Sequence, residues 1–290
     1  SGAVSGLASS VCLQPFDLLK TRVQQWDVIQ NGAEKPLKIA VNILRTDGPL
    51  GLWRGTTATM LRNVPGVAVY FTGLNYVRTV MATSRYFAAT WTQDRSDNKH
   101  HSTLPKLTSQ GNLLAGATTR TAVGVLLNPF TILKARYESS LYSYNSLSQA
   151  FIPLIRAGPS QYLRGALPSA LRDAPYAGLF VVVYERIKHD VGFVRPESTA
   201  AMSTAHSLSA ASAGAVAVLL THPFDVVKTK MQVRHEARYT GLLQTISTIH
   251  RQRGFVGFFD GTVLRMSRKV LSSAIGWAVY EGILIVMQNT

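Results

Sequence analysis

The stretch PFDLLKTR, at residues 15–22, returns as PFTILKAR at residues 129–136 and as PFDVVKTK at residues 223–230. Three related copies of one phrase predict a fold built from three copies of one structural unit. A proline inside a helix removes a backbone hydrogen bond and bends the helix, so we expect a bend at the proline of each copy. These prolines are Pro15, Pro129 and Pro223.

A second phrase follows each copy: two glycines seven residues apart, then an arginine seven residues after the second glycine. The glycine pairs are Gly48 and Gly55, Gly158 and Gly165, and Gly254 and Gly261. The arginines are Arg62, Arg172 and Arg268. This shared register is too regular for chance. It divides the chain into three repeats, at residues 1–83, 106–190 and 204–290.

Each repeat has the pattern of a long helix, a short amphipathic helix and a second long helix, so the predicted fold class is all-α. The first long helices are expected near residues 1–26, 106–138 and 204–235, the short ones near 36–46, 146–156 and 241–252, and the second long ones near 56–83, 167–190 and 262–288. The polar segment 84–105 is predicted to be a loop. His100 and His101 in it lack a third ligand at a metal-site spacing.

Only 16% of the 290 residues are charged, and the formal net charge is +15. An excess of positive charge is typical of proteins that bind nucleic acid or an anionic membrane surface. No basic helix face or interleaved aromatic motif favours nucleic acid, and no nucleophile–base grouping or phosphate loop favours an enzyme. We therefore expect no catalytic residues, no cofactor, no metal and no nucleic-acid partner.

The long helices approach the ~20 residues that a bilayer requires, but charges interrupt most of them. Only the uncharged run at residues 198–224 exceeds the roughly 18 residues of a simple membrane span. Charges within a span face a bundle interior or a watery cavity. The pattern therefore predicts six transmembrane helices that are apolar outside and polar inside, with Cys12 as a buried thiol.

Asp17 and Lys20 lie three residues apart and share one face of a helix. Around a threefold axis, the acid of one helix can meet the base of the next, which would close a ring of ion pairs across a pore. The alternative is a solvated helix end. It is disfavoured because the charges recur in register with the proline.

The repeated pattern Pro-x-Asp/Glu-x-x-Lys/Arg-x-Lys/Arg, with its glycine phrases, resembles the mitochondrial carrier family over essentially the whole chain. The resemblance implies a monomer with six transmembrane helices, threefold pseudosymmetry, short helices on the matrix side and one central site worked by alternating access. It places the chain in the mitochondrial inner membrane, with both termini toward the intermembrane space. The three phrases would form a matrix gate.

By the same resemblance, Asp17 pairs with Lys134 and Asp225 pairs with Lys20. Thr131 replaces the middle acid and leaves only a neutral partner for Lys228. The positions that brace the pairs in the family, nine residues after each proline, are Gln24, Glu138 and Gln232. Glu138 departs from the glutamine of the other two repeats and could itself answer a lysine.

A second gate, on the cytoplasmic side, is implied near the ends of the second long helices. Its residues are Asn75, Arg78, Glu185, Lys188 and Glu281, with Leu284 in place of the last base. Only Glu281 and Arg78 make a complete pair between helices by the cyclic rule. The sequence therefore predicts a weaker gate on this side.

The family's substrate contact points fall on three neighbouring pairs, Arg62 and Asn63, Arg172 and Asp173, and Arg268 and Lys269. Arginine can hold a carboxylate by paired hydrogen bonds, and an adjacent aspartate can hold an ammonium, so the middle pair suits an amino-acid zwitterion. Alternatively, Arg172 and Asp173 neutralise each other. Arg120 stands where the other repeats have glycine, either lining the site or serving as a structural arginine that caps backbone or answers Glu138.

The stretches NPFTILKARYES and LRDAP most resemble the glycine-carrying branch of the family, which supplies haem synthesis. The resemblance thus implies import of glycine into the matrix. Elementary chemistry alone gives a small amino acid or a similar zwitterion. Another small amino acid or a nucleotide is the alternative substrate, although Asp173 would repel phosphate.

Helix N-termini bind phosphate groups through free backbone amides. The turns that resemble the family's cardiolipin-binding sites are Trp53-Arg54-Gly55, Arg164-Gly165 and Tyr239-Thr240-Gly241. The resemblance therefore implies cardiolipin as a lipid partner.

Overall fold

The computed structural model describes residues 8–25, 35–84, 107–144, 146–192 and 199–288. These residues form helices and contain no strand. The predicted loop with His100 and His101 lies outside the described residues, apart from its first residue, as do the first residues of the first predicted helix.

The predicted order of long, short and long helices is present in each repeat. The long helices are α2 (Gln14–Gln25), α5 (Thr56–Ala82), α6 (Ser109–Leu126), α7 (Asn128–Glu138), α10 (Ala166–Gly192), α11 (Thr199–Val233) and α13 (Thr262–Gln288). The short helices are α4 (Pro36–Thr46), α8 (Leu147–Arg156) and α12 (Leu242–Arg253). Single-turn elements complete the chain: η1 (Pro49–Trp53), α9 (Pro159–Tyr162), η2 (Ala237–Tyr239) and η3 (Gly254–Phe259).

Two of the three prolines begin a helix, and the third lies inside one. Helices α2 and α7 each begin one residue before their proline, so Pro15 and Pro129 start a new helix after a break. This is the position where a missing backbone N–H costs least. The third helix, α11, continues through Pro223 without interruption. The hydroxyl of Thr221 there donates to the carbonyl of Ala217 over 2.7 Å, a contact that bends helices without ending them.

The paired glycines bracket the single-turn elements that join the short helix of each repeat to its second long helix. All six have a positive φ, between 61° and 90°. Only glycine adopts this region at little cost, and this explains their regular spacing. The second glycine of each pair also lies against the end of another repeat's first helix. A Cβ on Gly165 would lie 2.9 Å from Cγ of Gln232.

Each repeat has a small hydrophobic core beneath its short helix, and a helix of another repeat takes part in two of them. In repeat one, Leu18 of α2 packs with Ile39 and Ile43 of α4, and Leu264 of α13 packs against this cluster. In repeat two, Leu133 of α7 packs with Ala58 of α5. The repeats are therefore interlocked rather than independent.

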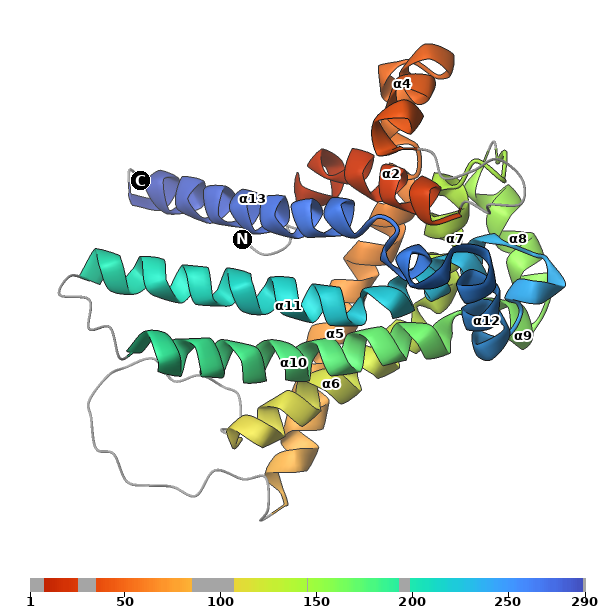
Figure 1. Ribbon diagram of the computed structural model, residues 1–290. Coiled ribbons are helices and arrows are strands. Elements are labelled where there is room, and N and C mark those ends of the chain that lie inside the picture. Colours follow the sequence, from red (N-terminus) through yellow and green to blue (C-terminus); the bar gives the residue numbers. More distant parts are fainter. Residues whose placement is uncertain (1–7, 26–34, 85–106, 145, 193–198, 289–290) are drawn as a thin grey trace.

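The long helices form a cyclic arrangement. Helix α6 packs against α5 and α10, α10 lies beside α11, and α13 contacts both α11 and α2. Figure 1 shows the axes of α10, α11 and α13 roughly aligned, with α11 antiparallel to the other two, while α5 crosses them. Helix α5 is linked to the segment before α2 through the side chain of Asn63, which donates to Ser10 over 2.8 Å.

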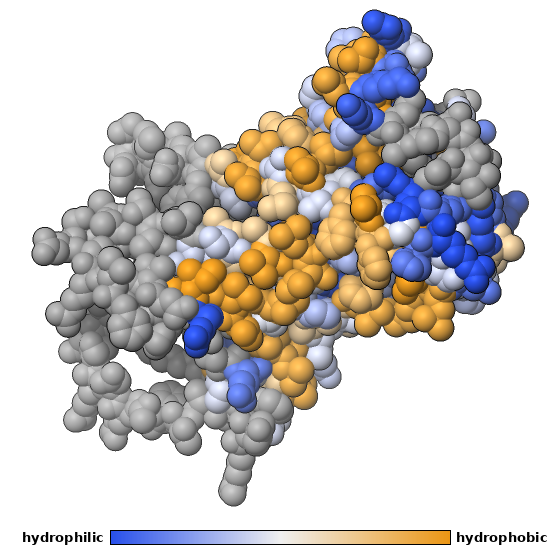
Figure 2. All heavy atoms as spheres, viewed as in Figure 1, coloured by the Kyte–Doolittle hydropathy of each residue, from blue (hydrophilic) through white to orange (hydrophobic). Residues whose placement is uncertain are grey.

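The outer surface is apolar in its middle and polar at one end. Figure 2 shows hydrophobic side chains over the long helices and hydrophilic ones at the end that carries α8, α9 and α12. Leu219 and Leu220 of α11 are among the exposed hydrophobic side chains of the long helices. By hydropathy, none of the helices in the described residues is long and apolar enough to count as a membrane span.

The expectation that Cys12 is buried is wrong, because this thiol is exposed. Its neighbour Val11 is exposed as well. Both side chains lie at the surface of the helical segment before α2.

We expect alanine at Gly165 to destabilise the fold more than alanine at Gly158. Both positions have a positive φ, which costs a residue with a Cβ about 1–3 kcal/mol, but only at Gly165 does the new Cβ also meet a neighbour. Thermal unfolding of the purified protein measures the difference, with Gly116→Ala, in an open helical position, as the control. Equal melting temperatures for Gly165→Ala and Gly116→Ala would contradict the packing role.

Candidate functional site

Six positions form a ring where the first long helices converge. We call them the charged ring: Asp17, Lys20, Thr131, Lys134, Asp225 and Lys228. Both ion pairs predicted between repeats are present. Lys134 contacts Asp17 over 2.5 Å, and Lys20 contacts Asp225. Both carboxylates are nearly buried, so each needs a cation partner to offset the loss of water.

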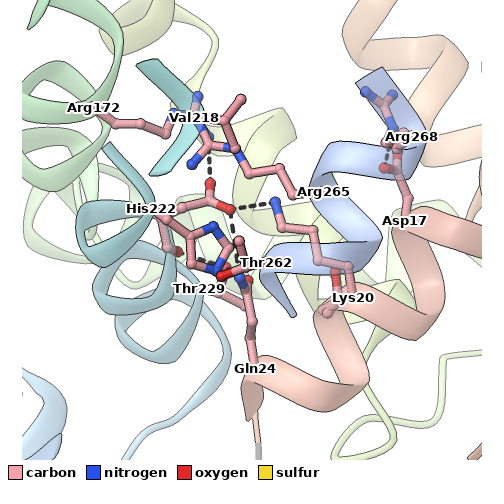
Figure 3. A network of polar contacts seen from close by, with 12 residues as sticks. Asp17, Lys20, Gln24, Arg172, Val218, His222, Thr229, Thr262, Arg265 and Arg268 are labelled. Atoms are coloured by element: carbon pink, nitrogen blue, oxygen red, sulfur yellow. Dashed lines mark hydrogen bonds and ion pairs between the residues drawn. The ribbon is translucent and has the colours of Figure 1, made fainter. Parts of the chain in front are cut away.

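The second long helices add an arginine to each acid position of the ring. Arg172 of α10 donates to Asp225 over 2.8 Å, and Arg268 of α13 pairs with Asp17. Arg62 of α5 donates to the hydroxyl of Thr131 over 3.0 Å. Figure 3 shows Arg172, Lys20 and Gln24 converging on one carboxylate, and Arg268 beside Asp17. Asp17 and Asp225 thus each receive a lysine from one repeat and an arginine from another, whereas Thr131 is contacted by an arginine.

The position of Thr131 is the incomplete part of the ring. Arg62 is a cation that contacts Thr131. By the threefold correspondence with Lys20 and Lys134, Lys228 is the lysine expected at this position. The Lys228 side chain is only 7% exposed. In the part of the chain that the structure describes, it makes no ion pair and no hydrogen bond, whereas the two equivalent lysines do.

Two of the three brace positions, Gln24 and Glu138, contact the ring, whereas Gln232 donates to Asn128 over 3.2 Å. Gln24 donates to Asp225 over 3.4 Å and accepts from Thr229 over 2.7 Å. Glu138 lies 3.5 Å from the ammonium of Lys134, so it does answer a lysine, as predicted. It also accepts a hydrogen bond from Thr21 over 2.7 Å. The acid therefore supports the Asp17–Lys134 pair through a shared lysine.

The residue before each proline is a structural contact that the sequence analysis missed. Gln14 donates to the carbonyl of Arg54 over 3.1 Å, and Asn128 donates to that of Arg164 over 3.0 Å. His222 lies 3.0 Å from the carbonyl of Asp260. Each side chain joins the break or bend of a first helix to the residue before the second glycine of its own repeat. The signal was present as a polar residue before all three prolines.

A cavity of about 510 Å³ lies between α5 and α6, within the roughly 300–1,000 Å³ of ligand sites. Its polar lining comes from the predicted substrate residues and from the incomplete part of the ring: Arg62, Asn63, Arg120, Thr131 and Asp173. Arg120 is exposed to this space. The structure gives Glu138 other partners, so the alternative in which Arg120 answers it is not what the geometry shows.

Arg172 and Asp173 pair with each other through two hydrogen bonds, of 2.8 and 3.0 Å. With its third contact to Asp225, the Arg172 guanidinium is fully engaged in this conformation. Of the two readings of this pair from sequence, the geometry matches mutual neutralisation. Asp173 still lines the cavity, and it is the one carboxylate among the described residues that line it.

The third predicted contact pair lies outside this cavity. Arg268 is bound to Asp17 in the ring. The Lys269 ammonium lies 3.8 Å from the centre of the Tyr176 ring, in a cation–π contact. In this conformation the cavity therefore uses residues of repeats one and two.

The predicted cytoplasmic gate lies mostly beyond what the structure describes. Asn75 is exposed and Arg78 half-buried on α5. The side chains of Glu185, Lys188 and Glu281 fall outside the described residues, so the pairing of Glu281 with Arg78 stays a prediction.

The predicted lipid-binding turns are tied into the repeats. Arg54 donates to the carbonyl of Tyr142 over 2.8 Å, and Arg164 donates to that of Tyr239 over 3.1 Å. Burial raises the pKa of Tyr142 to about 12, which keeps its hydroxyl protonated. Tyr239 is fully buried and Trp53 is exposed. Gly55 and Gly241 precede α5 and α12 without a side-chain cap, so the first amides of these helices lack that partner.

The family comparison agrees with the three repeats and with the charged ring that joins them. A family model described as "Mitochondrial carrier protein" matches residues 1–85, 105–193 and 200–290. The protein belongs to the mitochondrial carrier family. As a mitochondrial carrier it is a transporter rather than an enzyme.

Several relatives of this mitochondrial carrier are named "Mitochondrial glycine transporter". The one from Laccaria bicolor is 58% identical over 100% of this chain and 97% of its own length. Those from Aspergillus fumigatus and Saccharomyces cerevisiae are 39% and 38% identical, over 98% and 97% of this chain and 91% and 92% of their own lengths.

We expect Asp225→Asn to destabilise the carrier by about 3–5 kcal/mol, because it leaves the buried cations Lys20 and Arg172 without their shared carboxylate. Lys20→Gln should cost less, and adding it to Asp225→Asn should recover part of the loss, with a coupling of about 0.5–3 kcal/mol. Thermal unfolding in detergent measures all three.

The matched control is Lys228→Gln, which removes the equivalent lysine that has no ion pair. It should leave the melting temperature unchanged or raise it. Additive losses for Lys20→Gln and Asp225→Asn, or an equal loss for Lys228→Gln, would show that the ring pairs do not hold the helices together.

Proposed function

We propose that the protein moves glycine across the mitochondrial inner membrane into the matrix, where it supplies haem synthesis, by alternating access around a central site. The names of the relatives support the substrate, since they cover nearly the whole chain. Three carrier repeats, bounded near residues 1–83, 106–190 and 204–290, supply two long helices each to six membrane spans, as a monomer with both termini toward the intermembrane space.

The distribution of polar groups supports a membrane position. The charges of the long helices lie in the ring and around the cavity, whereas the outer surface over their middle is apolar (Figure 2). Inward-facing charge is how membrane helices tolerate ionised residues. This arrangement also explains why the hydropathy of each helix alone is low for a span.

The cavity is the observation that carries the substrate proposal. It brings together the cations Arg62 and Arg120, the amide of Asn63 and one carboxylate, Asp173. A small zwitterion needs both a cationic and an anionic partner, and the carboxylate disfavours a nucleotide by repelling its phosphates. Arg268 and Lys269 are proposed to join the site when the ring opens and releases Arg268 from Asp17.

The charged ring acts as the matrix gate in this proposal. Two of its three acid positions hold ion pairs between repeats, braced by Gln24 and Glu138. Opening toward the matrix separates these pairs. The incomplete third position lowers the number of pairs that must break. The second gate, with Asn75, Arg78, Glu185, Lys188 and Glu281, closes the opposite side.

Arg120→Ala should reduce glycine uptake and weaken apparent affinity roughly ten- to hundredfold, the worth of a charge-assisted contact. Arg120→Lys should keep part of the affinity. Asp173→Asn should weaken competition by glycine more than competition by acetate, since only glycine carries an ammonium. Uptake of labelled glycine by liposomes holding the purified carrier measures these effects, with Arg45→Ala on the exposed face of α4 as the control.

Absence of glycine uptake by the wild-type carrier would overturn the substrate proposal. Uptake of another amino acid or of a nucleotide in the same liposomes would identify the alternative. Normal uptake by both Arg120→Ala and Asp173→Asn would move the site away from this cavity.

Cardiolipin should raise the melting temperature of the carrier, because its phosphates can bind the uncapped amides at the start of α5 and α12. Phosphatidylcholine should have a smaller effect on the melting temperature. Phosphatidylglycerol, which carries one phosphate, tests whether negative charge alone stabilises the carrier or whether the two phosphates of cardiolipin are needed. Equal melting temperatures in cardiolipin and phosphatidylcholine would count against these lipid sites.

A further inference from the structure

The charged ring contains more cationic than anionic groups, and the excess is local. Asp225 is shared by Lys20 and Arg172, and Asp17 by Lys134 and Arg268. These two acid positions are complete. The third position presents a hydroxyl, Thr131, to the groups that would hold an acid.

Arg62 marks the empty place directly. It occupies the position in repeat one that Arg172 and Arg268 occupy in the other repeats, and these two bind carboxylates of the ring. Arg62 instead uses Nε on Thr131, over 3.0 Å, and Nη1 on Asn63, over 3.4 Å. Neither partner is charged, so this guanidinium makes no ion pair within the described residues, although Asp173 and Asp17 are among its charged neighbours.

Lys228 is the second unmatched cation. Its charged neighbours on the elements packed around it are the cations Arg172 and Arg62 and the carboxylates of Asp173 and Asp225. Both of these carboxylates already bind Arg172, and Asp225 also binds Lys20. A lysine that is 7% exposed and has no ion pair in the described chain is costly to keep charged. An anion from outside the chain would satisfy it.

We propose that the carboxylate of the substrate binds between Lys228 and Arg62, at the position where Thr131 leaves the ring without an acid. Thr131 and Arg62 line the cavity, so a ligand in it reaches these two residues directly, and Lys228 has Arg62 among its charged neighbours. Asp173 lines the same cavity and takes the ammonium. Arg172 is a positioning residue that holds Asp173. The substrate thereby supplies the third ion pair of the ring, and binding is coupled to the state of the matrix side.

This inference rests on the proposed transport of an amino acid and goes beyond it by assigning the carboxylate to Lys228, a residue of the ring. It also explains the threonine. An aspartate at position 131 would fill the place with a carboxylate of the chain and compete with the substrate.

The test compares glycine with glycinamide, which keeps the ammonium and lacks the carboxylate. Apparent affinities are measured by competition with labelled glycine in liposomes and by thermal shift. Wild-type carrier should prefer glycine by roughly tenfold or more. In Lys228→Gln and in Thr131→Asp the preference should fall to within about twofold, the first by loss of the cation and the second by its neutralisation.

Thr131→Asn is the matched control, because it has the size of aspartate without the charge and should keep the wild-type preference. Thr131→Asp should also fold more stably than Thr131→Asn, which shows that the new carboxylate reaches Lys228 or Arg62. A preference for glycine that persists in both Lys228→Gln and Thr131→Asp overturns the inference while leaving glycine transport intact. So does a wild-type carrier with no preference.

Absence of glycine uptake by wild type overturns the proposed function instead. The carboxylate position is then judged with acetate, which should raise the melting temperature of wild type and Thr131→Asn. It should not raise that of Lys228→Gln. An acetate shift retained by Lys228→Gln overturns the inference on its own.

Discussion

Ionised side chains inside the helix bundle must find counter-charges, and this constraint organises the molecule. Two nearly buried carboxylates, Asp17 and Asp225, each bind one lysine and one arginine that come from two other helices. A buried acid deprived of its partners is strongly destabilising. The helices are therefore held in register by charge at the centre, while the hydrophobic clusters lie farther out, beneath the short helices.

The positions of the charged ring follow threefold symmetry, but the residue types at those positions do not. Asp17 and Asp225 each bind a lysine and an arginine, whereas at the third position repeat two offers Arg62 a hydroxyl instead of a carboxylate. Glu138 and Ala135 continue the asymmetry, since the other repeats have glutamine and threonine at these positions. Two of the departures on repeat two, Thr131 and Arg120, line the cavity that lies between α5 and α6. In a transporter built of repeats, substrate recognition must come from such departures, because a zwitterion has no threefold symmetry.

The sequence predicted the helix order and the placement of the glycine turns, since both depend on register alone. The two lysine–carboxylate pairs were implied by the family resemblance. The sequence could not predict that Arg172 would bind Asp173 and Asp225 at once, because that depends on how α10 is rotated against α11. Continuity of α11 through Pro223 depends on local hydrogen bonding, and a proline pattern does not report it. A polar residue precedes each of the three prolines, but the residue type differs at Gln14, Asn128 and His222. Their shared contact with a backbone carbonyl was therefore not recognised from the sequence.

The core of repeat one includes a side chain from the last helix of the protein, Leu264 of α13. Helix α2 is made among the first residues and α13 among the last, so the first repeat emerges from the ribosome with one side of its core uncovered. The arginine that pairs with Asp17 arrives on the same late helix. Domains generally fold in the order in which they are synthesised, but the interlocking here removes that option. The first repeat is completed by a helix of the third, so one side of its core stays open until α13 has been made.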